Sequence, residues 1–269
     1  MPRSRANKHD STTALKDPRS LVGVVGGIGP EAGLDVVRRI YRMDAGVEET
    51  NRIGVLLHSV PALIADRNEF LLGRSSVNPA DGILEAIEGL ANCGAKVVGI
   101  ACNAAHSNPI FSVLEQGVCT RIGGDLRLIS MVDSVVDYLL VRSPSQTVAV
   151  LSVLGTYEEG VYERSLKAAG VRTVRIDRET AEMADALVWN RTYGVKYFPT
   201  LIPQTLEQYR TVLDQVEAAG AQVVVLACTE LSLISEASGN LNRTLSIVDA
   251  NQVFAAALYE AANPDSLVP

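Results

Sequence analysis

Histidine and cysteine are scarce in this sequence, and their scarcity excludes several kinds of site. The 269 residues include three histidines and four cysteines, and no two cysteines are spaced as C-x-x-C. Neither a zinc ribbon nor a thioredoxin-like redox motif is therefore predicted, and four cysteines in a chain of this length do not make a disulfide framework. We expect no metal site.

Positive charge and long apolar segments are also missing. The formal net charge is −7, which gives no support for binding to a nucleic-acid backbone. No apolar run reaches the roughly 18 residues that a membrane-spanning helix needs. Residues 1–19 are polar and contain no apolar run of signal-peptide length. We expect a disordered leader over residues 1–19, a cytoplasmic location, and neither a nucleic-acid nor a membrane partner.

The sequence does contain one phrase that is written twice. Residues 94–103 read GAKVVGIACN and residues 220–229 read GAQVVVLACT, so that Cys102 and Cys228 are 126 residues apart (228 − 102). Gly29 and Gly155, each following an apolar run, have the same separation (155 − 29 = 126). This repetition predicts two copies of one structural unit.

Apolar runs alternate with amphipathic stretches in both copies. The patterns predict strands at 21–25, 53–58, 147–153 and 173–176, and helices at 80–93, 161–169 and 206–219. Related phrases, SMVD at 130–133 and SIVD at 246–249, close the two copies. Continuously apolar strands alternating with helices predict an α/β fold of two similar lobes, each a mainly parallel sheet flanked by helices. We place the lobes at 20–143, whose last helix can cross over, and 144–262, followed by a tail at 263–269.

The repeated cysteines fall where such a fold binds ligands. Ligands of parallel sheets bind beyond the carboxyl ends of the strands, and both Cys102 and Cys228 end an apolar run. If a pseudo-two-fold axis relates the lobes, the two thiols face each other across a cleft. One could then remove a proton from a carbon atom while the other returns a proton to its opposite face, since a thiol pKa of about 8.5 makes both protonation states accessible. Cys93 and Cys119 lack this repetition and are expected to be ordinary small apolar residues.

Three motifs resemble those of a known family. GGIGPEA, ACNAAH and ACTEL, in this order and spacing, are similar to the motifs of the aspartate/glutamate racemases that work without pyridoxal phosphate, and the resemblance runs from about Leu21 to Leu258. It implies two α/β lobes with the active site between them, no cofactor and a homodimer. It assigns Cys102 and Cys228 as the acid/base pair, with Asn103 and Thr229 as donors to the α-carboxylate or amine of the substrate.

The substrate implied by the resemblance is a small acidic amino acid, with aspartate preferred. The segment that ends in Asp66-Arg67 resembles a loop of the aspartate-directed branch, in which the arginine binds the distal carboxylate. Lys196, in YGVK, resembles the lysine that supports this carboxylate from the second lobe. The alternative for either residue is a solvated surface charge.

Four further residues are candidates for the site. Gly27 belongs to the glycine loop, and Ser59 follows the predicted strand 53–58, where it either lines the pocket or simply ends the strand. Glu230 either orients a neighbouring group or caps the next helix. His106 either polarises the site or satisfies a local structural bond.

One departure from the family motif leaves other functions open. The first cysteine motif reads CNAAH where the family usually has CNTAH, so that Ala104 removes a hydroxyl near the substrate. Glutamate, another dicarboxylate, or binding of an amino acid without catalysis remain alternatives. A nucleotide-binding oxidoreductase is disfavoured, because the glycine spacing is G-x-G-x-x-x-G and Glu31 would lie where a pyrophosphate binds.

Overall fold

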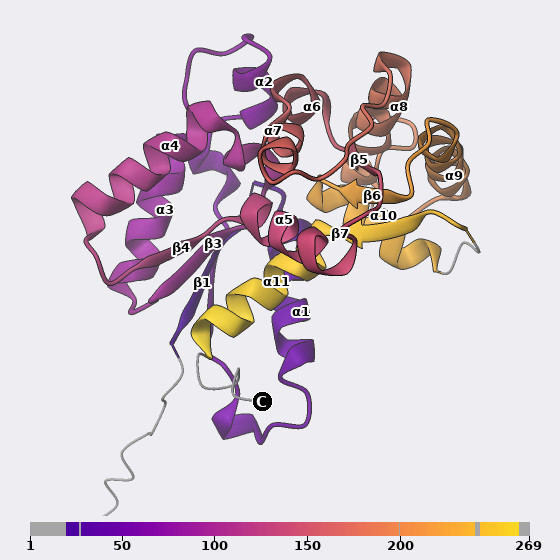
Figure 1. The fold of residues 1–269 in the computed structure, drawn as a ribbon. Helices are drawn as coiled ribbons and strands as arrows, with labels where there is room; N and C mark the ends of the chain where they lie inside the picture. Colours follow the sequence, from indigo (N-terminus) through magenta and orange to yellow (C-terminus); the bar gives the residue numbers. More distant parts are fainter. Residues whose placement is uncertain (1–19, 27, 199, 240–242, 264–269) are drawn as a thin grey trace, which may run out of the picture.

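The computed structural model describes residues 20–26, 28–198, 200–239 and 243–263, which form two parallel β-sheets with helices around them (Figure 1). The predicted leader, Gly27 and residues 264–269 of the predicted tail lie outside these ranges. The first sheet has the order β2-β1-β3-β4 and the second the order β5-β6-β7, and every pair of neighbouring strands is parallel. The strands are β1 (Val22–Val25), β2 (Val55–His58), β3 (Val97–Ile100), β4 (Arg127–Ile129), β5 (Val148–Leu151), β6 (Val223–Leu226) and β7 (Ser246–Asp249). The predicted α/β architecture is confirmed.

Helices follow the strands in both halves of the chain. The α-helices are α1 (Pro30–Met43), α2 (Arg67–Leu71), α3 (Ala80–Asn92), α4 (Asn108–Gly117), α5 (Met131–Arg142), α6 (Leu154–Glu159), α7 (Val161–Ala168), α8 (Arg178–Trp189), α9 (Pro203–Ala218), α10 (Thr229–Ser238) and α11 (Ala250–Ala262). Short helical turns lie at η1 (Glu49–Asn51), η2 (Pro61–Leu63), η3 (Asn103–His106), η4 (Val118–Ile122) and η5 (Val195–Tyr197).

One apolar core joins the two sheets. Its buried residues come from β1 and β3 of the first sheet, from β5 and β6 of the second, and from α5 and α11. Figure 1 shows α5 and α11 between the sheets, with α11 returning along α1 after the second sheet is complete. Met131 of α5 and Phe254 of α11 are fully buried there. Because both helices pack on both halves, burial of apolar surface fixes the relative position of the two sheets.

The strands show where the two copies are equivalent. β1 and β5 start 126 residues apart (148 − 22), as do β3 and β6 (223 − 97). Val97 pairs with Arg127 and Val223 with Ser246, so the last strands are separated by 119 residues (246 − 127), and the first copy holds 7 additional residues (126 − 119). The phrases SMVD and SIVD are therefore not equivalent, because the first opens α5 whereas the second forms β7.

The strand predicted at 173–176 is reduced to one parallel bridge, between Val148 and Thr173. Two backbone bonds flank this bridge, from Val148 N to Arg172 O and from Val174 N to Val148 O, at 2.9 Å each. The prediction is wrong in length for a physical reason. Asp177 already accepts a hydrogen bond from Thr180 N as the N-cap of α8, so the chain has to leave the sheet edge.

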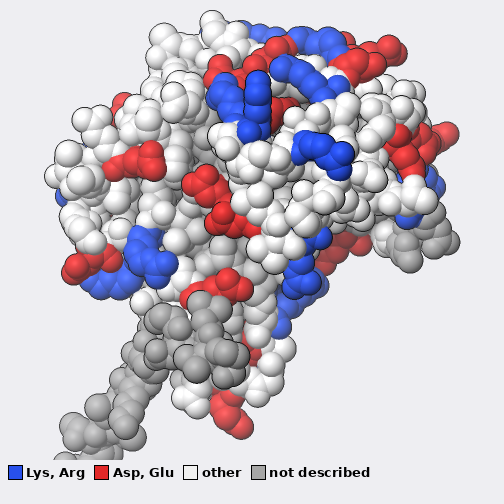
Figure 2. Space-filling view, viewed as in Figure 1, with Lys and Arg blue, Asp and Glu red and all other residues white. Residues whose placement is uncertain are grey.

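Among the described residues, no helix has both the length and the apolarity to cross a membrane. On the molecular surface, acidic and basic side chains are interspersed over the face drawn in Figure 2.

A buried carboxylate ties α1 to α11. Asp35 is 2% exposed and accepts hydrogen bonds from Arg39 Nε at 2.8 Å, Arg38 Nη2 at 2.6 Å and Asn251 Nδ2 at 2.8 Å. Burial favours the neutral acid, but these bonds and the charge of Arg39 outweigh it and leave the pKa of Asp35 lowered. Asp35 is therefore charged at neutral pH and neutralises a buried arginine.

We predict that Asp35→Ala lowers the free energy of unfolding by about 3 kcal/mol, because it leaves the buried Arg39 without its closest carboxylate. Arg38→Ala is the matched control, since Arg38 binds the same carboxylate from a side chain that is 48% exposed; its loss should stay below about 1 kcal/mol. Urea unfolding at pH 7 measures both variants. Equal losses would contradict the assignment of Asp35 as the element that holds the two helices together.

Candidate active site

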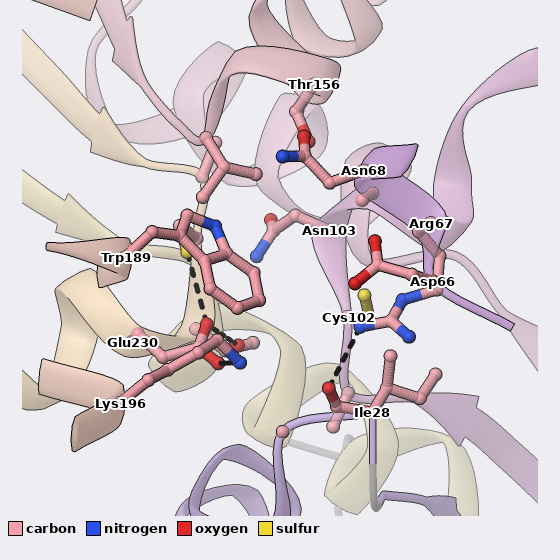
Figure 3. Close-up of a pocket in the computed structure, with 17 residues that line it drawn as sticks. Ile28, Asp66, Arg67, Asn68, Cys102, Asn103, Thr156, Trp189, Lys196 and Glu230 are labelled. Atoms are coloured by element: carbon pink, nitrogen blue, oxygen red, sulfur yellow. Dashed lines mark hydrogen bonds and ion pairs between the residues drawn. The ribbon is translucent and has the colours of Figure 1, made fainter. Parts of the chain in front are cut away.

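A cavity between the two sheets lies at the carboxyl ends of their central strands (Figure 3). Its empty space, including the part open to solvent, is about 430 Å³. Cys102 follows β3 and Cys228 follows β6, and both line the cavity. The other lining residues are Ile28, Gly29, Asp66, Arg67, Asn68, Ala101, Asn103 and Ala104 from the first half, and Val153, Thr156, Trp189, Lys196, Ala227, Thr229 and Glu230 from the second.

The two thiols enter this cavity from opposite sides. The Cys228 thiol donates a hydrogen bond to Glu230 Oε2 at 3.2 Å. In Figure 3, Glu230 and Cys102 lie on opposite sides of the cavity. Cys228 is 5% exposed and Cys102 is partly buried, whereas Cys93 and Cys119 are exposed and line no part of this cavity. The duplicated motif thus brings its two cysteines to one site.

The carboxylate of Glu230 sets the electrostatics beside Cys228. It accepts hydrogen bonds from the Cys228 thiol and, at 2.9 Å, from Thr229 Oγ1, and it forms an ion pair with Lys196 Nζ at 2.5 Å. Burial first, and then the Glu230 charge, raise the pKa of Cys228 well above its usual value. Cys228 is therefore a protonated thiol at neutral pH.

The Lys196–Glu230 pair is charged in spite of its burial. Burial favours the neutral amine, but the Glu230 charge outweighs it and raises the pKa of Lys196. Burial likewise favours the neutral acid, and the charge and hydrogen bonds of Lys196 outweigh it and lower the pKa of Glu230. The second half of the chain thus supplies one cation and one anion to the cavity.

Backbone contacts hold Arg67 at the opposite wall. Asp66 caps the short helix α2 by accepting a hydrogen bond from Glu69 N at 3.0 Å. Arg67, the first residue of α2, donates from Nη2 to Ile28 O at 2.9 Å and from Nη1 to Ala65 O at 3.2 Å. Its Nε is buried and has no hydrogen-bond partner in the described part of the chain. The guanidinium is therefore fixed in place with its Nε donor unused.

Two hydrogen bonds join the halves of the chain at the cavity. The Tyr162 hydroxyl donates to Asn103 Oδ1 at 2.5 Å, and Gly155 N donates to Asn68 Oδ1 at 2.6 Å. The first bond fixes the side-chain amide of Asn103, so that Nδ2 is its donor. Burial raises the pKa of Tyr162 far above its usual value, so that its hydroxyl keeps donating. Asn103 Nδ2 is buried without a partner among the described residues.

A comparison with models of protein families identifies the family of the chain. The family model for Asp/Glu/hydantoin racemases matches residues 25–258, which is most of the chain. The chain belongs to this racemase family. Racemases are isomerases, so the chain belongs to a family of isomerases.

Solved structures of the family share this fold. An aspartate racemase from Picrophilus torridus has a TM-score of 0.71 at 24% identity, covering 91% of this chain and 94% of the other. An aspartate racemase homologue from Pyrococcus horikoshii has a TM-score of 0.68 at 20% identity, covering 91% and 99%. A glutamate racemase from Bacillus anthracis has a TM-score of 0.61 at 16% identity, covering 92% and 83%. The two-lobed architecture is common to them.

In this racemase-family chain, eight of the ten predicted site residues line the cavity or hold its wall. Cys102, Cys228, Asn103, Thr229, Arg67, Lys196 and Glu230 line it, and His106 lies behind Cys102. Ser59 is exposed and does not belong to the lining. Gly27 lies outside the described residues. No group of three or more His, Cys, Asp or Glu side chains in the described ranges is arranged to hold a metal ion.

Sequence reasoning missed Trp189, Thr156 and Asn68, which also line the cavity. Trp189 ends α8 and Asn68 lies in α2, and neither stands beside a repeated motif. Thr156 follows Gly155, so its place after an apolar run was a usable signal. No repeated motif surrounds Trp189, so only the structure shows that it lines the cavity.

His106 serves the structure behind Cys102. Its Nδ1 donates to Cys102 O at 2.9 Å, and its Nε2 accepts from Met131 N, at the start of α5, at 3.1 Å. Burial lowers the pKa of His106 to about 4. Of the two roles expected for His106, the structure favours the local structural bond.

We predict that burial of His106 makes the protein less stable in mild acid. The unfolded chain binds a proton at a pKa near 6.5, whereas the folded chain binds it only near 4, so stability is lost as the pH falls from about 6.5 towards 4. Between pH 7 and pH 4.5 the expected loss from this residue is on the order of 2 to 3 kcal/mol. Urea unfolding of the wild type and of His106→Gln at both pH values measures it. The two proteins should differ in this pH dependence, and parallel curves would contradict the prediction.

Proposed function

We propose that this chain is a cofactor-independent amino-acid racemase that inverts the α-carbon of a small acidic amino acid. Aspartate is the preferred substrate of the proposal, and two cysteines serve as the acid and the base. The observation that carries the proposal is the approach of Cys102 and Cys228 to one cavity from opposite sides, each from the end of an equivalent strand. Inversion needs this arrangement, because the proton has to leave one face of the carbon and return to the other.

In one direction of the proposed reaction, protonated Cys228 is the general acid and the Cys102 thiolate is the general base. The thiolate takes the α-proton, the electron pair of the C–H bond stays on a planar carbanion, and Cys228 gives its proton to the opposite face. After turnover the protonation states of the two sulfurs are exchanged. The same pair then serves the reverse reaction, so no external acid or base is consumed.

The cationic groups support a substrate with two carboxylates. Arg67 and Lys196 approach from different halves of the chain, and Arg67 Nε has no partner among the described residues. Lys196 Nζ already pairs with the Glu230 carboxylate at 2.5 Å, so a substrate carboxylate would compete with Glu230 for this ammonium group. In this proposal Asn103 and Thr229, beside the two thiols, bind the α-carboxylate, where negative charge develops in the transition state.

Aspartate is favoured over glutamate by the resemblance of the Asp66-Arg67 segment to the aspartate-directed branch. Glutamate differs by one methylene, and a hydrophobic contact of that size discriminates only about 10- to 200-fold. The homodimer and the cytoplasmic location follow from the resemblance and the sequence, and both stay predictions.

We predict that L-aspartate in deuterium oxide gives D-aspartate carrying α-deuterium, with no pyridoxal phosphate added. Cys102→Ser and Cys228→Ser should each lower racemisation by about 10² to 10⁴-fold, the usual contribution of a general acid or base. Any residual α-exchange should be confined to opposite enantiomers in the two variants, because each retains one thiol on one face. Chiral chromatography and proton NMR measure both quantities.

The matched controls are Cys93→Ser and Cys119→Ser, since both cysteines are exposed and away from the cavity. Both should keep wild-type activity. Full racemisation by either cavity variant would remove that cysteine from the mechanism. Activity with glutamate and none with aspartate would contradict the proposed substrate but would leave the proposed role of the two thiols unchanged.

We predict that Glu230→Gln moves the alkaline limb of the kcat/KM profile to lower pH. The Glu230 carboxylate helps to raise the pKa of Cys228, so its removal lowers that pKa, and the acid loses its proton earlier as the pH rises. Glu236→Gln is the control, because Glu236 lies on the same helix α10 but pairs with Arg38 and Arg42 outside the cavity. If the alkaline limb of the kcat/KM profile stays at the same pH in Glu230→Gln, ionisation of Cys228 does not determine that limb.

A further inference from the structure

The side chain of Trp189 lines the cavity but has no part in the proton transfers described above. Trp189 is the single tryptophan of the chain. Its Nε1 is buried and has no hydrogen-bond partner among the described residues. A buried donor without an acceptor costs about 1 to 3 kcal/mol, so its presence in a cavity indicates that a ligand supplies the acceptor.

Three other buried donors in the same cavity share this property. Arg67 Nε, Asn103 Nδ2 and Thr156 Oγ1 have no hydrogen-bond partner in the described ranges either. Each half of the chain thus contributes two donors, and a ligand with two carboxylates can satisfy the donors on both sides of the cavity. Ala104, which also lines the cavity, carries no donor of its own.

The indole of Trp189 lies between Lys196 and the side of the cavity that holds Asn103 and Thr156. Lys196 Nζ lies 4.7 Å from the ring centroid, in a cation–π contact. Figure 3 shows the indole nitrogen turned towards the side of the cavity where Asn103 and Thr156 lie, with Lys196 on the other side of the ring. One rigid ring system therefore touches the lysine expected at the distal carboxylate and turns its N–H towards Asn103, a donor expected at the α-carboxylate.

The chain around Trp189 fixes this geometry. Leu187 and Val188, the preceding residues of α8, are fully buried. Gly194 N donates to Asn190 O at 2.6 Å and closes the short connection from Trp189 to Lys196. A Cβ atom at Gly194 would lie 2.5 Å from Asn190 O, so this turn leaves no room for a side chain. Trp189 and Lys196 are thus held in one rigid unit.

We propose that Trp189 is the specificity-determining residue of the site, whose N–H binds the α-carboxylate while its ring positions Lys196 for the distal one. The inference rests on the proposed function and adds the means by which the site selects chain length. The indole contacts Lys196 and carries the other donor, so it sets the separation of the two carboxylate-binding groups. Through that separation it selects aspartate, the substrate of the proposed function, over the longer glutamate.

The test uses the intrinsic fluorescence of the full chain, because its single tryptophan reports from the cavity itself. Titration with L- and D-aspartate should change the emission saturably, and glutamate should need a concentration at least about 10-fold higher. Alanine, which has an α-carboxylate but no distal one, should need a higher concentration than aspartate to change the emission. Calorimetry with aspartate should give the same Kd as fluorescence, and binding without any change in emission would overturn the proposal.

Trp189→Phe separates the N–H from the ring, since phenylalanine keeps an aromatic face for Lys196. We predict that it lowers kcat/KM for aspartate by about 10- to 100-fold, as for loss of a hydrogen bond to a charged group, and lowers it less for glutamate. A merely structural role would lower both equally. Tyr197→Phe is the control, because Tyr197 directly follows Lys196 in η5, is 42% exposed and does not line the cavity.

Failure of the inference and failure of the proposed function give different results. A chain that binds aspartate with a change in emission but forms no D-aspartate contradicts the racemase and keeps Trp189 in the binding site. A chain that racemises aspartate with an unchanged aspartate-to-glutamate ratio in Trp189→Phe keeps the racemase and overturns the role of Trp189. The fluorescence titration of the wild type decides the role even if the variant does not fold.

Discussion

Parallel pairing of the central strands is the constraint on which the site depends. β3 is hydrogen-bonded on both sides, by β1 and β4, and β6 is likewise bonded by β5 and β7. All these strands run in the same direction within their sheet, so the residues that follow them gather at one edge. The core that includes α5 and α11 then fixes the two edges towards each other. A shift of either central strand by one residue would turn its cysteine to the other face, so the strand register also positions the thiols.

The sequence was most informative where burial leaves little choice. Strands covered on both faces need continuous apolar runs, which is why the 126-residue repeat located β1, β3, β5 and β6 and the two cysteines that follow two of them. It was least informative where tertiary contacts decide. The bridge at Thr173 replaces a strand because Asp177 caps the next helix, and Trp189 reaches the cavity only through the packing of α8 and the turn at Gly194. No local pattern encodes either outcome.

Duplication has kept the thiols alike and the groups around them different. The register that aligns Cys102 with Cys228 also aligns Asn103 with Thr229 and Ala104 with Glu230 (230 − 104 = 126). Arg67 opens a helix after β2, whereas Lys196 lies in a turn after α8. The proposed inversion requires similar acid/base chemistry on both faces of one carbon, whereas the proposed amino-acid substrate has two unlike ends. Repetition therefore suits the proton-transfer groups, and divergence suits the binding groups.

The same divergence gives the two thiols different neighbours before any substrate binds. Cys228 donates to the carboxylate of Glu230, and burial together with that charge holds its pKa high, whereas the position equivalent to Glu230 beside Cys102 carries only a methyl group. The protein with Cys228 protonated is consequently the form that meets the substrate. Under the proposed two-cysteine mechanism, the proton acceptor in that form is Cys102, so the enantiomer whose α-hydrogen faces Cys102 would react first. Its mirror image would react only after the sulfurs had exchanged their protonation states, so the proposed symmetric reaction would have an asymmetric starting point.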